Sequence, residues 1–180
     1  TVEPAAKQVL AAKPNLRVIV RAPTAAASSL AWRSVLGGWL VQEPDRASGD
    51  SPGTFRVVTK RQPSEAEQRD LLFAWVVCAH VTSNAIVIAK DEATVGIGQG
   101  QPSRVRAVRL AIQNAGPRCR GAVLASDGFF PFPDSLECAG QAGISAGIQP
   151  GGSVKDAEVI AAADRAGVAM LFTGVRHFRH

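Results

Sequence analysis

Apolar residues fall into short runs that alternate along the chain with longer amphipathic segments. The runs are rich in β-branched residues and are bounded by glycine and proline, which is typical of buried strands. This alternation predicts an α/β fold with a mainly parallel sheet that helices cover on both faces. The predicted strands span 16–20, 34–42, 55–59, 84–89, 94–98, 122–125, 144–148 and 168–172. Three predicted helices span 3–13, 64–81 and 103–114, and two more begin near residues 134 and 153.

Several helix starts carry capping signals. Ser64 and Glu67 form a capping-box pattern, in which the serine side chain accepts from the amide of residue 67 and the glutamate reaches back. Residues 134–137 and 153–156 also resemble helix starts. The helix that follows Ser64 should bury one stripe of side chains, namely Leu71, Leu72, Trp75, Val76 and Ala79.

The first fifty residues have the least regular pattern. A glycine pair at 37–38 interrupts the strand predicted over 34–42, and glycine inside a strand is typical of a β-bulge or of a close backbone approach. Residues 44–53 are polar, and we predict a mobile loop there. Because the chain begins at Thr1 rather than at a methionine, we expect it to be a piece of a longer protein.

Composition and charge narrow the class of protein. Of the 180 residues, 46% are hydrophobic, which is too many for a disordered chain. No apolar run approaches the roughly 20 residues of a membrane span. The three cysteines (Cys78, Cys119 and Cys138) are too few for a disulfide scaffold and favour a reducing compartment, so we predict a cytoplasmic protein. The net charge of +5 comes without a Lys/Arg run, so scattered arginines fit an anionic small molecule as well as a nucleic acid.

Two segments near the middle of the chain combine polar residues with glycine. Asn84 lies at a helix–strand junction, where its position alone favours a turn former. In residues 96–104, glycines would let backbone amides approach a ligand, and the helix start at Ser103 would favour an anion. This spacing matches neither a Walker A loop nor the dinucleotide fingerprint, so a ligand-binding loop and a plain connection remain equally open.

Two later segments are rich in aromatic or basic residues. Residues 126–134 hold three phenylalanines among two prolines. A stiff aromatic wall of this kind suits a planar heterocycle, although a hydrophobic plug under the sheet competes for at least one ring. The C-terminal residues 176–180 form either a solvated basic tail or a pocket that combines cations, a ring and a carboxylate.

Five motifs occur together and in order: SNAIV (83–87), GQGQPSR (98–104), SDGFFPF (126–132), QPGGS (149–153) and RHFRH (176–180). Together with GGWLVQ (37–42) and FAW (73–75), they resemble the C-terminal part of the AICAR transformylase domain in the bifunctional AICAR transformylase/IMP cyclohydrolase family. The resemblance spans nearly the whole chain.

The resemblance implies a fold and a reaction. Members of this family transfer the formyl group of 10-formyltetrahydrofolate to the 5-amino group of AICAR, giving FAICAR in de novo purine (IMP) biosynthesis. Residues 1–180 would form the second of two cytidine-deaminase-like α/β/α units, each with a mixed, mostly parallel sheet. We therefore expect a cytoplasmic transferase that belongs to a multifunctional homodimer, with AICAR and folate as partners and neither nucleic acid nor membrane. The N-terminal half and the cyclohydrolase (hydrolase) domain would lie outside this chain.

The resemblance also assigns site residues. In catalysis, Asn84 would hold the formyl oxygen as charge develops on it, and His180 would lie close to the reaction centre. Arg176 would bind the AICAR phosphate, with Phe178 and Arg104 also contacting the nucleotide. The folate site would comprise Ser103, Arg104, Val105, Phe129, Pro131 and Asp134.

The chain departs from the family pattern beside Asp134. Pro133 stands where the family has arginine, and Ser135 stands where it has asparagine, which affects the expected folate contacts. No transition metal is implied. Some members bind a potassium ion near the asparagine and Ser-Asp segments, to which Asp127 would contribute.

The family's catalytic base is a Lys-His pair in the first deaminase-like unit. No Lys-His dipeptide occurs here, and the histidines are His80, His177 and His180. We therefore expect the chain alone to be an inactive half-site. The alternative is a non-catalytic folate- or nucleotide-binding fragment. A zinc deaminase is disfavoured because the chain has no H-x-E and no C-x-x-C motif.

Overall fold

The computed structural model describes residues 2–13, 15–20, 30–43, 45 and 54–179, and the chain divides into two compact units, 1–44 and 45–180. The predicted loop 44–53 lies outside the described residues except for Asp45. None of the helices in the described part of the chain has the length and apolar character that a membrane span requires.

In its described residues, the first unit contains one helix and one hairpin. Helix α1 (Pro4–Ala11) begins with proline in its first turn and confirms the prediction for this segment, whereas residues 16–20 form no strand. The single strand predicted over 34–42 is wrong. The segment contributes to two antiparallel strands, β1 (Ala31–Val35) and β2 (Gly38–Gln42), because Gly37, with φ +77°, forms the turn between them.

The second unit is built on a six-stranded sheet in the order β3-β8-β7-β6-β4-β5. Parallel pairing joins β6 to β7 and β7 to β8, and the other three pairings are antiparallel. The mixed sheet is therefore confirmed, with its parallel pairing in the central strands. The strands are β3 (Arg56–Val57), β4 (Ile86–Lys90), β5 (Ala93–Gly98), β6 (Val123–Ser126), β7 (Ala146–Gln149) and β8 (Ala169–Phe172).

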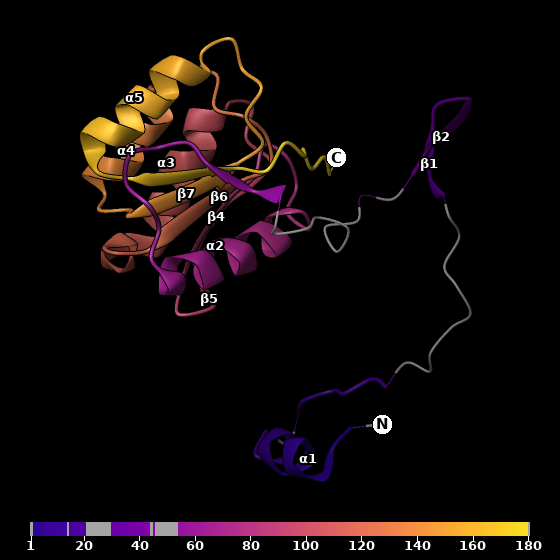
Figure 1. Ribbon diagram of the computed structural model, residues 1–180. Coiled ribbons are helices and arrows are strands. Elements are labelled where there is room, and N and C mark those ends of the chain that lie inside the picture. The colour runs from indigo at the N-terminus through magenta and orange to yellow at the C-terminus, as the bar shows by residue number, and fades with distance from the viewer. Residues whose placement is uncertain (1, 14, 21–29, 44, 46–53, 180) are drawn as a thin grey trace. The chain divides into compact units, whose positions relative to one another are not determined.

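Helices cover both faces of this sheet, which confirms a three-layer α/β/α architecture (Figure 1). Helix α2 (Glu65–Cys78) packs on one face, and α3 (Arg104–Ala115), α4 (Asp134–Gln141) and α5 (Asp156–Ala166) pack on the other. Because strand side chains alternate, Leu124 enters the core under α3–α5 and Ala125 the core under α2. A short 3₁₀ helix (Gly116–Cys119) follows α3.

The capping box predicted at the start of α2 is present, with both of its hydrogen bonds. The buried stripe is partly corrected, because Val76 is 48% exposed and Leu72 only half-buried. Ala74 and Cys78 are buried in addition to Leu71, Trp75 and Ala79. The buried face of α2 is therefore rotated about the helix axis relative to the predicted face. Small side chains occupy much of it.

The start of α5 differs from its prediction. Ser153 does not cap the helix, which begins at Asp156. Instead the Asp156 carboxylate accepts from the backbone N–H of Gly152 at 2.7 Å and from that of Ser153 at 3.2 Å. These two hydrogen bonds tie the loop between β7 and α5 to the first residue of the helix.

Two glycines of the 96–104 segment serve packing. A Cβ on Gly96 would lie 2.3 Å from the carbonyl oxygen of Ala111, and one on Gly98 would lie 2.0 Å from that of Ala107. Strand β5 therefore rests directly on the backbone of α3. At these two positions the packing explanation accounts for the glycine, without a ligand.

Candidate functional site

The predicted site residues come from segments that meet at one end of the six-stranded sheet. Strand β4 is antiparallel to both β5 and β6, and Ile86 pairs with Gly98 on one side and with Ser126 on the other. The start of β4 therefore lies beside the ends of β5 and β6. Asn84, which precedes β4, and Asp127, which follows β6, consequently lie at the same end of the sheet.

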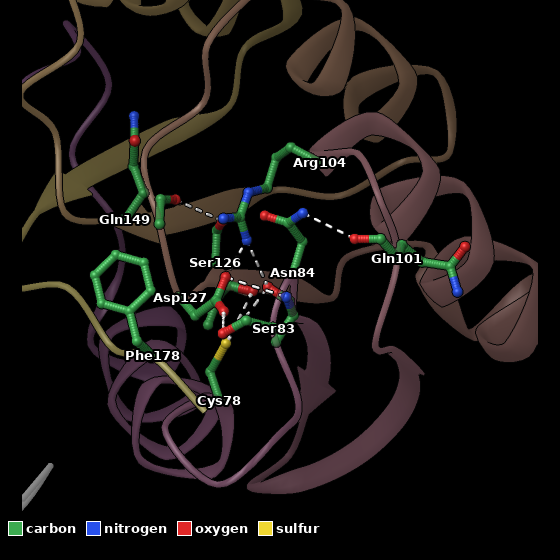
Figure 2. Close-up of polar contacts among 12 residues, drawn as sticks. Cys78, Ser83, Asn84, Gln101, Arg104, Ser126, Asp127, Gln149 and Phe178 are labelled. Atoms are coloured by element: carbon green, nitrogen blue, oxygen red, sulfur yellow. Dashed lines mark hydrogen bonds and ion pairs between the residues drawn. The ribbon is translucent and has the colours of Figure 1, made fainter. Parts of the chain in front are cut away.

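A buried ion pair forms the centre of this end. Asp127 is 1% exposed, and its Oδ1 accepts from the backbone N–H of Ala85 at 3.1 Å and from Nη1 of Arg104. Its Oδ2 accepts from the Ser83 hydroxyl at 2.5 Å. We call Ser83, Ala85, Arg104 and Asp127 the Asp127 network (Figure 2). The guanidinium balances the buried carboxylate, which is costly to bury unpaired.

The surroundings of the network restrict what it can do. A Cβ on Gly128 would lie 2.5 Å from Nη2 of Arg104, so the Ser-Asp-Gly sequence leaves room for the guanidinium. The sulfur of Cys78 lies 3.7 Å from the carbonyl oxygens of both Ala85 and Ala125, which share its single S–H donor. Burial, and next the charge of Asp127, raise the pKa of the Cys78 thiol. The thiol therefore stays protonated and is not a nucleophile.

The side chain of Arg104 is more buried than expected for a residue whose sole role is to contact a ligand. Its side chain is 9% exposed, and Nη1 also donates to the carbonyl of Ala85 at 3.2 Å. The family resemblance assigns Arg104 to ligand contact, and no signal in the sequence indicates that it pairs with Asp127.

Asn84 reaches from the β4 junction toward the loop after β5. Its Nδ2 donates to the carbonyl of Gln101 at 2.8 Å, and the side chain is half-buried. A primary amide has a second N–H and a carbonyl oxygen, so Asn84 keeps hydrogen-bonding capacity. Ser103 is the N-cap of α3 but forms no side-chain capping bond, and Val105 is half-buried beside it.

The three phenylalanines of 126–134 have different environments. Phe130 is 1% exposed and belongs to the core under α3–α5, so the plug interpretation is confirmed for this ring. Phe132 is 57% exposed. Phe129 is half-buried, and the guanidinium carbon of Arg176 lies 4.6 Å from its ring centroid. Pro131, which stands between Phe130 and Phe132 in the sequence, is half-buried.

Residues 173–179 are tied to the sheet end by backbone hydrogen bonds. The N–H of Thr173 donates to the carbonyl of Gln149 at 2.9 Å, and that of His177 donates to the carbonyl of Asp127 at 3.0 Å. Farther on, the N–H of Ser83 donates to the carbonyl of Arg179 at 2.9 Å. The tail therefore crosses the ends of β7 and β6 and reaches the start of β4. His180 lies outside the described residues.

Sequence reasoning missed Asp45. Its Oδ1 lies 2.8 Å from Nδ1 of His177, and its Oδ2 accepts from the N–H of Phe178 at 3.2 Å. His177 is 1% exposed. A single acidic residue in a polar stretch carries no sequence signal for a contact 132 positions away.

Asp134 lies at the first turn of α4, where a carboxylate is favoured by the helix dipole. Its Oδ1 accepts from the N–H of Ser135 at 2.7 Å and from the Ser135 hydroxyl at 3.4 Å. Ser135 is buried. Within the described residues, no hydrogen bond joins Asp134 to the other predicted site residues.

Among the described residues, no three His, Cys, Asp or Glu side chains are grouped to hold a metal ion. The positive charge beside Asp127 comes from Arg104. Binding of a potassium ion near Asp127 stays a prediction.

The chain matches known proteins over its whole length. A family model described as "AICARFT/IMPCHase bienzyme" matches residues 1–114. The bifunctional purine biosynthesis protein PurH of Synechococcus elongatus is 52% identical over 180 residues, which are 100% of this chain and 35% of the relative. PurH of Sorangium cellulosum is 55% identical over 179 residues, covering 98% of this chain and 34% of the relative. The chain thus spans about a third of the length of these relatives.

Among solved structures, Acinetobacter baumannii RibD (form 2) aligns with a TM-score of 0.44 and 17% identity, covering 61% of this chain and 36% of that one. This likeness is too weak to support a conclusion about the fold. The family match and the identities near 50% are decisive, and the chain belongs to the AICARFT/IMPCHase bienzyme family.

Proposed function

We propose that this chain supplies one half of an AICAR formyltransferase site, which transfers the formyl group of 10-formyltetrahydrofolate to AICAR in purine biosynthesis. The observation that carries the proposal is the position of Arg176 over the ring of Phe129, at the sheet end that also holds Asn84. A cation suited to a phosphate and an aromatic wall suited to a heterocycle are thereby adjacent. The family membership supplies the substrates.

The AICAR side would be formed by the C-terminal tail. Arg176 is exposed, and no acidic side chain among the described residues forms an ion pair with it. Its Nη2 lies 3.9 Å from the position of a Cβ on Gly152, so the guanidinium lies beside the loop after β7. A guanidinium fork binds a phosphate through two parallel hydrogen bonds. Phe178, 50% exposed, would stack on the nucleotide.

The folate side would be formed by the loop after β6 and the start of α3. Phe129 and Pro131 would form the wall. Asp134 would accept from N–H donors of the pterin through its Oδ2, since Oδ1 already accepts from Ser135. Ser103 and Val105, both half-buried at the first turn of α3, would line the opposite side together with the remaining N–H groups of Arg104.

The reaction forms a bond between the amine nitrogen of AICAR and the formyl carbon and breaks the bond from that carbon to the folate nitrogen. The amine loses a proton, and the leaving nitrogen gains one. The second N–H of Asn84 would donate to the oxyanion that forms at the formyl oxygen. The Asp127 network would hold the backbone on both sides of Asn84, and His180 would lie close to the reaction centre. In this proposal the base lies outside the chain.

A second candidate is a folate- or nucleotide-binding fragment without turnover. The observation that favours it is the coverage of only about a third of the relatives' length. A cytoplasmic location and a homodimer stay predictions in either case.

The test is the substitution Arg176→Ala in a full-length bifunctional protein that carries this sequence. Loss of a charge-assisted phosphate contact should raise the Kd for AICAR about 10- to 100-fold in calorimetry, with a smaller effect on folate affinity. Arg179→Ala is the matched control, because it removes a cation from the same tail and keeps the backbone bonds to Ser83. An unchanged AICAR affinity in Arg176→Ala would remove this residue from the phosphate role.

A further inference from the structure

Gln149 is a completely buried glutamine at the end of β7. It begins the QPGGS motif, yet none of the assigned roles uses it. A glutamine side chain carries two donors and an acceptor, and burying such a group is unfavourable unless it finds partners. Its contacts therefore indicate what the residue does.

The side chain and backbone of Gln149 contact three separate segments. Oε1 accepts from the backbone N–H of Phe130 at 3.0 Å. Nε2 lies 3.4 Å from the sulfur of Met170 on β8. The carbonyl oxygen accepts from the N–H of Thr173, where the C-terminal tail begins. One residue thus joins the loop after β6, strand β8 and the tail.

The contact with Phe130 bears on the aromatic wall. The N–H of Phe130 belongs to the peptide group that joins it to Phe129, so this hydrogen bond fixes the peptide immediately after the wall ring. On the other side of Phe129, the Ser126 hydroxyl donates to the carbonyl of Gly128 at 2.7 Å. These two hydrogen bonds hold the backbone on both sides of Phe129, and of the two, the one that comes from outside the loop is made by Gln149.

We propose that Gln149 is a positioning residue for the folate wall. Its amide oxygen sets the place of Phe129 and Pro131, and so governs folate binding more than AICAR binding. This inference rests on the proposed function, because it takes the ring of Phe129 to be the surface on which the folate lies.

The test uses full-length protein that carries this sequence and measures KM for 10-formyltetrahydrofolate and for AICAR separately. Gln149→Met keeps the length and volume of the side chain but removes the acceptor for Phe130. It should raise the folate KM about five- to tenfold, the size expected for loss of a buried hydrogen bond, and leave the AICAR KM within about twofold. Ile148→Val is the matched control, since it perturbs the neighbouring buried position on β7 without touching Phe130. It should change neither KM.

A double-mutant cycle with Phe129→Ala tests the route of the effect. If Gln149 acts through the wall, Gln149→Met should add little to the folate KM of Phe129→Ala. Fully additive effects, or equal increases in both KM values, would overturn the proposal. If Gln149→Met does not fold, Gln149→Asn replaces it, because the side chain is one methylene shorter and its oxygen no longer reaches the N–H of Phe130. Gln149→Asn should also raise the folate KM. An unchanged folate KM in Gln149→Asn would overturn the proposal.

The same measurements separate this inference from the proposed function. If the unsubstituted protein transfers no formyl group, or if Phe129→Ala leaves the folate KM unchanged, the proposed function fails. If Phe129→Ala raises the folate KM and the Gln149 variants do not, the inference alone fails.

Discussion

Oδ1 of Asp45 lies 2.8 Å from Nδ1 of His177, although the two residues are 132 positions apart. The other carboxylate oxygen accepts from the N–H of Phe178. The ring centroid of His177 lies 4.4 Å from that of Trp75 on α2. The contacts with Asp45 and Trp75 hold the middle of the C-terminal tail, and with it the residues on either side of His177.

Substitution of Asp45 should therefore weaken AICAR binding from a distance. In a full-length protein that carries this sequence, Asp45→Ala removes the acceptor for His177 and Phe178, and we expect the Kd for AICAR to rise about three- to tenfold. Asp45→Asn keeps one carbonyl oxygen and should have a smaller effect. Calorimetric titration with AICAR measures both.

Glu43→Ala is the control for Asp45, because it removes an exposed carboxylate two residues upstream. It should leave AICAR affinity unchanged. Equal losses in Glu43→Ala and Asp45→Ala would attribute the effect to net charge rather than to the contact with His177.

Packing against α3 yields a second prediction. A methyl group on Gly98 would lie 2.0 Å from the backbone oxygen of Ala107, which cannot move without displacing the helix. Gly98→Ala should lower the free energy of unfolding by about 1–3 kcal/mol or more, as overpacking does. Urea denaturation of the purified chain measures the loss. Thr94→Ala, at an exposed position of the same strand, should cost less than about 1 kcal/mol, and similar losses in both variants would contradict the packing argument.

The fold was predictable where local pattern and local chemistry agree. Apolar runs located the six strands of the large sheet, and the capping box located the start of α2. The hairpin in the first unit was not predictable as such, because a glycine pair permits a bulge and a turn alike. The exposure of Val76 depends on how α2 is rotated against the sheet, which local periodicity does not determine.

The candidate site was predictable as a set of segments and less so as a set of contacts. The motifs located Asn84, Arg104, Phe129 and the tail, and the sheet topology brings them to one end. The sequence did not indicate that Arg104 pairs with Asp127, since that contact joins residues 23 positions apart on different elements. The roles of the site residues rest on the family resemblance, and their tests are the substitutions described above.

A carboxylate outside the site makes stability depend on pH. Burial alone would raise the pKa of Glu67, but hydrogen bonds from Arg61, Ser145 and Ser64 outweigh it and lower the pKa from 4.5 to about 2. A group whose pKa is lower in the folded state stabilises the fold above its unfolded pKa, and this contribution is lost as pH falls. The free energy of unfolding should therefore drop between about pH 4.5 and pH 2.

The size of this drop is limited because Arg61 is partly exposed, with 39% of its side chain accessible. We expect about 1–2 kcal/mol from Glu67 after solvent screening. Chemical denaturation at a series of pH values measures it, and Glu67→Gln should remove that part of the pH dependence. An identical pH profile in Glu67→Gln would show that other carboxylates account for it.

The absence of the family's Lys-His pair leads to the last prediction. Formyl transfer to a weakly nucleophilic aromatic amine needs a base for the amine proton as well as stabilisation of the oxyanion. In the proposed function Asn84 performs the second task, and the resemblance assigns the base to a unit outside this chain. The purified 180-residue chain should therefore release no tetrahydrofolate in an AICAR-dependent manner, whereas a full-length protein that carries it should do so in the same assay. Calorimetry of the chain with AICAR and with a folate analogue would detect binding without turnover. Robust turnover by the isolated chain would place a sufficient base within these residues and overturn the division of the site between two units.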